Sequence, residues 1–290
     1  MTNKKIFLVT GGAGFIGSHL CERLAKDSSH MVYSLDNYFT GTEANHVADV
    51  RYIKGDTRNI ARLVNFSPDV IFHLGEYSRV EQSFEDMEAV WAANKDGTFA
   101  VLEFALKSAS KLVYAGSSTK FGDGGLAREA TPYAWTKATN TELVINYGRW
   151  YDLTYAITYF YNVYGPREIA SGKYATLIAL FRQKMINNEP LTVVSPGTQE
   201  RNFTHIDDVV NALLLVGEYG VGDEYGIGCD DSYSINSIAE MFGGEIQMIP
   251  ERKGNRMSAA VISEKTKQLG WSAKVNIVDY IKEVSRENQR

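Results

Sequence analysis

The chain has 290 residues, of which 44% are hydrophobic and 22% are charged, and its formal net charge is −5. This composition is typical of a globular protein with one large domain or two unequal ones, and the acidic balance leaves no basic surface for nucleic acid or for an anionic membrane. The two cysteines, Cys21 and Cys229, belong to no metal-binding pattern, so we expect neither a metal site nor a disulfide framework.

The first half of the chain predicts strands that alternate with helices. Five short apolar runs have the length of buried parallel strands: 6–9, 31–35, 50–54, 70–74 and 111–115. Helical periodicity lies between them, at 19–26 and 83–108. Strands alternating with helices favour an α/β fold, so we expect a Rossmann-like doubly wound parallel sheet over residues 1–162.

The second half has a looser pattern, with helical periodicity at 176–187 and 207–219. We expect residues 163–290 to form mainly a smaller substrate-binding lobe, with some segments returning to the first sheet. No apolar run reaches membrane-spanning length, and the strand pattern that begins at Lys5 leaves no room for a signal peptide. A cytoplasmic location is therefore expected.

A glycine-rich turn follows the first strand and opens a helix. Its glycines, Gly11, Gly14 and Gly17, have the spacing that allows a tight turn, close approach of the backbone to a pyrophosphate, and helix–strand packing. Asp36 ends the second strand, where a carboxylate accepts hydrogen bonds from a ribose diol and repels a 2′-phosphate. The pattern predicts a dinucleotide site that prefers NAD over NADP.

Tyr133 and Lys137 lie one helical turn apart, and Ser117 ends the fifth strand. A tyrosine is a poor base near neutral pH, but a neighbouring ammonium and a positive nicotinamide ring favour its phenolate form. Such a tyrosine can remove a hydroxyl proton while hydride leaves the same carbon. We therefore predict Ser117, Tyr133 and Lys137 as the catalytic residues.

In order and spacing, these motifs resemble those of the extended short-chain dehydrogenases/reductases, in the nucleotide-sugar epimerase/dehydratase group. The resemblance covers nearly the whole chain. Besides Ser117, Tyr133 and Lys137, it rests on residues 11–17, 36–37, 55–56, 73–74, 94–98, 162–166, 201–208, 252–256 and 269–271.

This resemblance implies that Ser117 hydrogen-bonds the reacting sugar hydroxyl, Tyr133 deprotonates it, and Lys137 holds the nicotinamide ribose. The cofactor contacts that it implies are Gly11, Gly14, Phe15, Ile16, Gly17, Asp36, Asn37, Asp56, Thr57, Leu74, Gly75, Asn94, Tyr133, Lys137 and Tyr161.

The implied substrate is a nucleoside-diphosphate sugar, and arginine offers a donor fork that suits its phosphate oxygens. The substrate contacts expected are Ser117, Ser118, Thr119, Asn162, Arg201 and Arg252, with Glu76 as a further candidate. Family members commonly form homodimers through the helices after the fourth and fifth strands, so we expect a homodimer.

The residues after Ser117 bear on the reaction. Related 4,6-dehydratases carry a glutamate base two positions after the catalytic serine or threonine, where this chain has Thr119. A hydroxyl is a weak base, so we favour a 4-epimerase or a net 4-dehydrogenase, both of which oxidise C4 without a second base. A dehydratase with a base outside residues 117–119 is the alternative.

Three departures from the family pattern concern the same region. The segment from Ser117 to Tyr133 is shorter than usual, and Lys120-Phe121 replaces a usual Val-Tyr. Glu76 stands where a small residue is usual, and it either reaches the nicotinamide or the sugar or lies on an exposed loop. A Glu76 that faces the sugar would supply the missing base for dehydration or for epimerisation at C3 or C5.

Two other classes of function compete with these. The first is a non-catalytic sensor or scaffold that binds NAD, which the intact Ser117, Tyr133 and Lys137 disfavour. The second is a reductase of small carbonyl compounds, which would not need two phosphate-type arginines.

Overall fold

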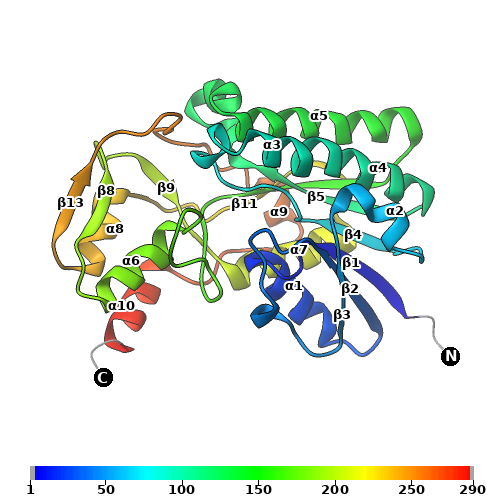
Figure 1. The fold of residues 1–290 in the computed structure, drawn as a ribbon, viewed down its shortest axis with the longest axis horizontal. Coiled ribbons are helices and arrows are strands. Elements are labelled where there is room, and N and C mark those ends of the chain that lie inside the picture. The colour runs from blue at the N-terminus through cyan, green and yellow to red at the C-terminus, as the bar shows by residue number, and fades with distance from the viewer. Residues whose placement is uncertain (1–3, 288–290) are drawn as a thin grey trace.

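The computed structural model describes residues 4–287, and its centre is a seven-stranded parallel sheet in the order β11-β6-β5-β4-β1-β2-β3 (Figure 1). This sheet confirms the predicted Rossmann-like fold class, and all five predicted strands lie in it. Its strands are β1 (Lys5–Thr10), β2 (His30–Asp36), β3 (Val50–Lys54), β4 (Val70–His73), β5 (Lys111–Ser117), β6 (Tyr155–Phe160) and β11 (Gly222–Ile227).

Helices cover both faces of the sheet because the apolar strands bury side chains on both sides. In β1, Val9 packs toward α1 and α7 on one face, and Leu8 packs toward α2, α4 and α5 on the other. The helices of this domain are α1 (Phe15–Ala25), α2 (Ile60–Leu63), α3 (Met87–Val90), α4 (Thr98–Lys107), α5 (Pro132–Tyr151), α7 (Ile206–Tyr219) and α9 (Glu264–Gln268).

The helix predicted over 83–108 is not continuous in the structure. It consists of a 3₁₀ turn, η3 (Gln82–Phe84), then α3, a π-helical segment, η4 (Trp91–Gly97), and α4. Gly97 lies so close to Thr57 that a Cβ would meet its Oγ1 at 2.4 Å. The π-helical segment therefore occurs where this helix approaches the segment that contains Thr57. This is a tertiary contact, which the local periodicity of the sequence cannot predict.

A smaller lobe lies beside the carboxyl ends of the strands, at the left of Figure 1. Its core includes Phe181, Ile238 and Ile281. Its elements are β7 (Val163–Tyr164), α6 (Leu177–Ile186), β8 (Leu191–Val194), β9 (Glu200–Asn202), β10 (Thr204–His205), β12 (Ser232–Ser234), α8 (Ile235–Phe242), β13 (Ile246–Ile249) and α10 (Ile277–Glu287). From the same half of the chain, β11 pairs with β6 and α7 packs against α1 in the main domain. None of the helices within residues 4–287 is long and apolar enough to cross a membrane.

Candidate active site

A cavity of about 790 Å³ collects nearly all the residues that the sequence singled out. It is lined by the glycine turn, by residues that follow β2, β3, β4 and β5, and by segments of the smaller lobe. The predicted site residues that line it are Gly11, Gly14, Phe15, Ile16, Gly17, Asp36, Asn37, Asp56, Thr57, Leu74, Gly75, Glu76, Ser117, Ser118, Thr119, Tyr133, Lys137, Asn162, Arg201 and Arg252.

The glycine turn forms a cradle that side chains would fill. A Cβ on Gly17 would lie 2.1 Å from the Gly11 carbonyl oxygen, and one on Gly11, at φ +75°, would lie 2.9 Å from the Gly75 Cα. Gly14 precedes α1 and has no side chain to cap it, so the first N–H groups of α1 can meet a ligand. The turn therefore fits the pyrophosphate of a dinucleotide.

Asp36 is buried at the end of β2 and lines the cavity. Its Oδ2 accepts a hydrogen bond from the Ala13 N–H at 2.9 Å, and its Oδ1 accepts one from the Tyr38 N–H at 2.7 Å. Burial raises the pKa of this carboxyl, against the effect of the two N–H donors. Both oxygens keep lone pairs for further donors, which suits a ribose diol.

The proposed catalytic residues come from β5 and α5. Ser117 ends β5, and the α5 cap places Tyr133 in the first helical turn: the Thr131 hydroxyl accepts from the Ala134 N–H, and Pro132 begins the helix. The Thr119 hydroxyl donates to Ser117 Oγ at 2.9 Å, so the Ser117 hydroxyl hydrogen is left for another acceptor. Neither Ser118 nor Thr119 supplies a carboxylate.

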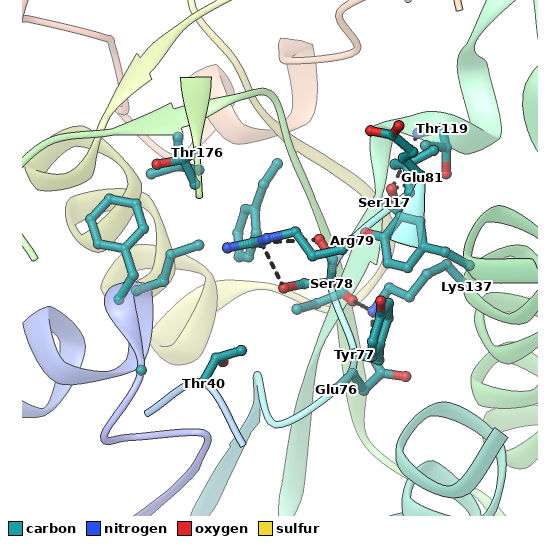
Figure 2. Close-up of a pocket in the computed structure, with 18 of the residues that line it drawn as sticks. Thr40, Glu76, Tyr77, Ser78, Arg79, Glu81, Ser117, Thr119, Lys137 and Thr176 are labelled. Carbon is teal, nitrogen blue, oxygen red and sulfur yellow. Dashed lines mark hydrogen bonds and ion pairs between the residues drawn. The ribbon is translucent and has the colours of Figure 1, made fainter. Parts of the chain in front are cut away.

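Lys137 and Glu76 form an ion pair at the cavity floor. The Lys137 side chain is 5% exposed, and its Nζ donates to Glu76 Oε2 and to the Ala115 carbonyl oxygen. The Glu76 side chain is 3% exposed, so it is not a surface loop glutamate. In the view of Figure 2, Glu76, Ser117 and Lys137 lie on one side of the cavity and Thr176 on the other.

Three arginines line the cavity where β9 meets residues 252–256: Arg201, Arg252 and Arg256. Arg201 Nη2 donates to the Asn255 side chain and to the Arg256 carbonyl oxygen, and burial, followed by the charge of Arg256, lowers the pKa of Arg201 to about 10. Arg256 donates to Ser118 Oγ at 3.2 Å, and within residues 4–287 its Nη1 is buried without a partner. These guanidinium groups therefore have donors to offer an anion.

Arg252, the predicted partner of Arg201, has a different setting. Its side chain is 44% exposed and forms an ion pair with Glu81 at 2.7 Å. It lines the cavity, but Arg256 is the more buried of the two. Sequence reasoning missed Arg256 because residues 251–256 contain several charges and nothing local distinguishes the inward one.

Asn94 and Tyr161 do not line the cavity. The Asn94 amide is fully buried, accepts from the Tyr77 N–H and donates to Thr136. The Tyr161 hydroxyl donates to the Ala260 carbonyl oxygen and accepts from the Ile262 N–H. These contacts order the loops around the cavity, and direct cofactor contacts by these two residues remain predictions.

Two further cavity residues had no signal in the sequence. Arg79 extends into the middle of the cavity in Figure 2, and its Nε donates to the Tyr174 carbonyl oxygen at 2.9 Å. Glu168 follows β7, its Oε2 accepts from the Gly165 N–H at 2.8 Å, and its Oε1 is buried without a partner in the described part of the chain. Burial raises the pKa of Glu168 from 4.5 to about 7.

The short segment after Ser117 is held by the C-terminal part of the chain. Asp123 Oδ1 accepts from the N–H groups of Met257 and Ser258, next to the inward-facing Arg256. The unusual Lys120 does not line the cavity but donates to Tyr159 and pairs with Asp223. In the range 4–287 no three His, Cys, Asp or Glu side chains are grouped to hold a metal ion.

Comparison with known proteins shows a matching family and several similar proteins. Residues 7–228 match the model of the NAD dependent epimerase/dehydratase family. The chain is 32% identical to a UDP-N-acetyl-alpha-D-glucosaminuronate decarboxylase of Bacillus cytotoxicus, over 82% of this chain and 79% of that protein. It is 28% identical to a UDP-glucose 4-epimerase of Mycolicibacterium smegmatis, over 94% and 95%. A UDP-glucose 4-epimerase of Thermus thermophilus, solved in complex with NAD, superposes with a TM-score of 0.87 at 26% identity, covering 98% of this chain and 99% of that one.

Proposed function

The chain belongs to the NAD-dependent epimerase/dehydratase family, and from this premise we propose that it oxidises the C4 hydroxyl of a nucleoside-diphosphate sugar. Its relatives include epimerases and decarboxylases of UDP-sugars, so the family accommodates more than one outcome after oxidation. The proposal is that this chain acts as a 4-epimerase or as a net 4-dehydrogenase.

In this proposal each side chain has one task. Ser117 donates its hydroxyl hydrogen to the sugar oxygen, as its hydrogen bond from Thr119 allows. Tyr133, as phenolate, takes the proton of the sugar hydroxyl, and Lys137 holds the ribose and stabilises the phenolate. Bound NAD supplies the acceptor for the hydride that leaves C4. The arginines hold the diphosphate, where their charge and buried donors are suited to phosphate oxygens.

The observation that carries the choice of reaction is that the two residues after Ser117 have hydroxyl side chains where a dehydratase is expected to carry its carboxylate base. Dehydration at C5 and C6 needs a base for the C5 proton, and Ser118 and Thr119 offer hydroxyl groups instead. Glu76, the nearby buried carboxylate, accepts from Lys137, Thr98, Tyr114 and Asn140. Epimerisation needs no such base, because the ketone can turn and accept the hydride on its other face.

The test is incubation of the purified protein with NAD and a panel of UDP-, GDP-, dTDP- and CDP-sugars. Mass spectrometry and sugar NMR would identify the products. A new epimer of unchanged mass supports epimerisation, and a mass loss of two hydrogens supports dehydrogenation. Release of water or carbon dioxide would contradict the proposal.

Tyr133→Phe is the matched variant. It removes the hydroxyl and keeps the ring, so turnover should fall by at least about 100-fold, the usual contribution of a positioned acid–base group. Binding of NAD should stay within about threefold of the parent, since the Phe ring keeps the packing. Turnover equal to that of the parent would refute the catalytic role of Tyr133.

We also propose a homodimer that forms through α3, η4, α4 and α5. Large apolar side chains are exposed on these helices, with Trp91 43% and Trp150 60% exposed. The rings of Trp91 and Trp135 stack at 6.2 Å between centroids, joining η4 to α5 in one surface. Such exposed apolar area is typical of an interface with another chain.

A further inference from the structure

Glu76 is the feature that the proposed reaction leaves unexplained. It follows β4, at a position where the sequence resemblance leads us to expect a small residue. A carboxylate this deeply buried costs free energy unless it is paired and hydrogen-bonded. In this chain the cost is offset by an ion pair with the lysine of the proposed catalytic triad.

Each oxygen of Glu76 has defined partners. Oε1 accepts from Thr98 Oγ1 at 2.8 Å, from Asn140 Nδ2 at 3.0 Å and from the Tyr114 hydroxyl at 3.1 Å. Oε2 accepts from Lys137 Nζ. Donors thus approach the carboxylate from β5, α4 and α5, and the Lys137 ammonium group is one of them.

None of the other titratable groups described around Glu76 forms an ion pair with it. Burial lowers the pKa of His73 to about 4, so the imidazole is neutral at pH 7 and bonds to Thr98 through Nε2. Burial and then the charge of Glu76 raise the pKa of Tyr114 well above its ordinary value, so this hydroxyl stays a donor. Lys95 is directed to Thr139 and Asn140. The strong charge–charge contact of Glu76 is therefore with Lys137.

We propose that Glu76 is a positioning residue that balances the charge of Lys137 and thereby biases the bound cofactor toward its oxidised form. The nicotinamide ring is positively charged in NAD⁺ and neutral in NADH, so a negative charge at the cavity floor favours NAD⁺. Without the negative charge of Glu76, the positive charge of Lys137 would repel the positive nicotinamide ring and the site would favour NADH. This inference rests on the proposed function in one respect, the location of Lys137 beside the nicotinamide ribose.

The bias suits a reaction in which the hydride returns to the sugar. In that step the two electrons and the hydrogen go back to C4, the ketone becomes an alkoxide, and the alkoxide takes its proton from Tyr133. Charge balance at Lys137 favours this reverse transfer, because it stabilises the cofactor form that the transfer restores. Glu76 thus has a role in the reaction without acting as a base on the sugar.

The test compares the affinities of NAD⁺ and NADH for the parent, for Glu76→Gln and for Glu76→Ala, at one pH and ionic strength. Both substitutions remove the negative charge, and the second introduces a small residue such as we expect in the family. The ratio of Kd for NAD⁺ to Kd for NADH should rise about tenfold in both, as when a charge within roughly 10 Å is removed at an effective dielectric constant of about 20. Thermal unfolding of each variant shows whether it is folded.

Glu103→Gln is the matched control, since Glu103 accepts a hydrogen bond from Tyr147 and does not line the cavity. It should leave the ratio unchanged, and Glu76→Asp should restore most of the parent ratio. A second readout is the acidic limb of the pH–rate profile, which should move to lower pH in Glu76→Gln because the unbalanced ammonium favours the Tyr133 phenolate.

A merely structural role for Glu76 predicts that both affinities fall together. A ratio within twofold of the parent in both Gln and Ala variants would therefore overturn the inference. The titrations need no sugar, so they separate it from the proposed function. A shifted ratio without turnover of any nucleotide sugar would remove the proposed reaction and keep the charge effect. Turnover of a nucleotide sugar with an unchanged Kd ratio would keep the proposed reaction and remove the charge effect of Glu76.

Discussion

Replacing Glu168 by glutamine is expected to remove a loss of stability that the protein suffers as the pH rises. Glu168 lines the cavity between β7 and α6, where one oxygen accepts from the Gly165 N–H at 2.8 Å and the other is buried without a partner in the described chain. Burial raises the pKa of this carboxyl from 4.5 to about 7. The native protein therefore holds a proton on Glu168 at pH values where the unfolded chain releases it.

The size of the effect follows from this difference. Between pH 4.5 and about 7 the native state binds one more proton than the unfolded state, so the free energy of unfolding falls as the pH rises. Each pH unit in this window costs about 1.4 kcal/mol, and the whole window costs about 3 kcal/mol. Glutamine keeps the acceptor for Gly165 and takes up no proton, so its contribution does not change across the window.

Urea unfolding of cofactor-free protein at pH 4.5, 6 and 8 would measure the effect, since bound NAD would add its own binding free energy. Relative to the parent, Glu168→Gln should gain about 3 kcal/mol between the lowest and highest pH. The change with pH is the relevant quantity, because any constant cost of the amide cancels. Glu129→Gln, at a carboxylate with a 73% exposed side chain, is the control. A gain below about 1 kcal/mol for Glu168→Gln would refute the assignment of a buried, protonated carboxyl.

Two further substitutions test the cofactor cradle and the interface. Gly17→Ala places a Cβ 2.1 Å from the Gly11 carbonyl oxygen, so the turn must shift and the Kd for NAD should rise at least about tenfold. Gly243→Ala is the control, because Gly243 lies in open space outside the cavity at φ +75° and ψ 176°. It should cost about 1–3 kcal/mol of stability and leave the Kd for NAD unchanged. An equal loss of NAD affinity in both variants would indicate general destabilisation. Trp91→Glu should convert a dimer to a monomer in light scattering, whereas an unchanged mass would place the interface elsewhere.

The fold could be predicted because its signals are local. The apolar runs that form β1 to β5 are short, continuous and bounded by turns, which is how strands buried on both faces appear in a sequence. The cavity also followed from chain order, since parallel strands bring Asp36 and Ser117 to the same edge of the sheet. Most of the predicted site residues do line that cavity.

Side-chain direction could not be predicted in the same way. Three interpretations of Glu76 were open from the sequence. Its contact with Lys137 depends on the pairing of β4 with β5 and on the packing of α5 against β5, which join segments far apart in the chain. Arg252 and Arg256 are four positions apart in one charged loop, and the bonds of Asp123 to residues 257 and 258 help to hold Arg256 beside Ser118. These are tertiary contacts, and composition and periodicity contain no information on them.

The distribution of charge within the cavity connects the two proposals. Among the described residues, Arg201 and Arg256 form no ion pair with a carboxylate, so their charge is available to an anionic group of a ligand. Lys137 instead forms an ion pair with Glu76. A nucleoside-diphosphate sugar has its charge on the diphosphate and a neutral hydroxyl at C4, so arginines without an ion pair and a lysine paired with Glu76 suit its two parts. If Glu76 were the base of a dehydratase, it would have to leave three donors, Thr98, Tyr114 and Asn140, and an uncompensated Lys137 behind, at the cost of an unpaired buried charge. The same ion pair therefore argues against elimination and for reversible transfer at C4.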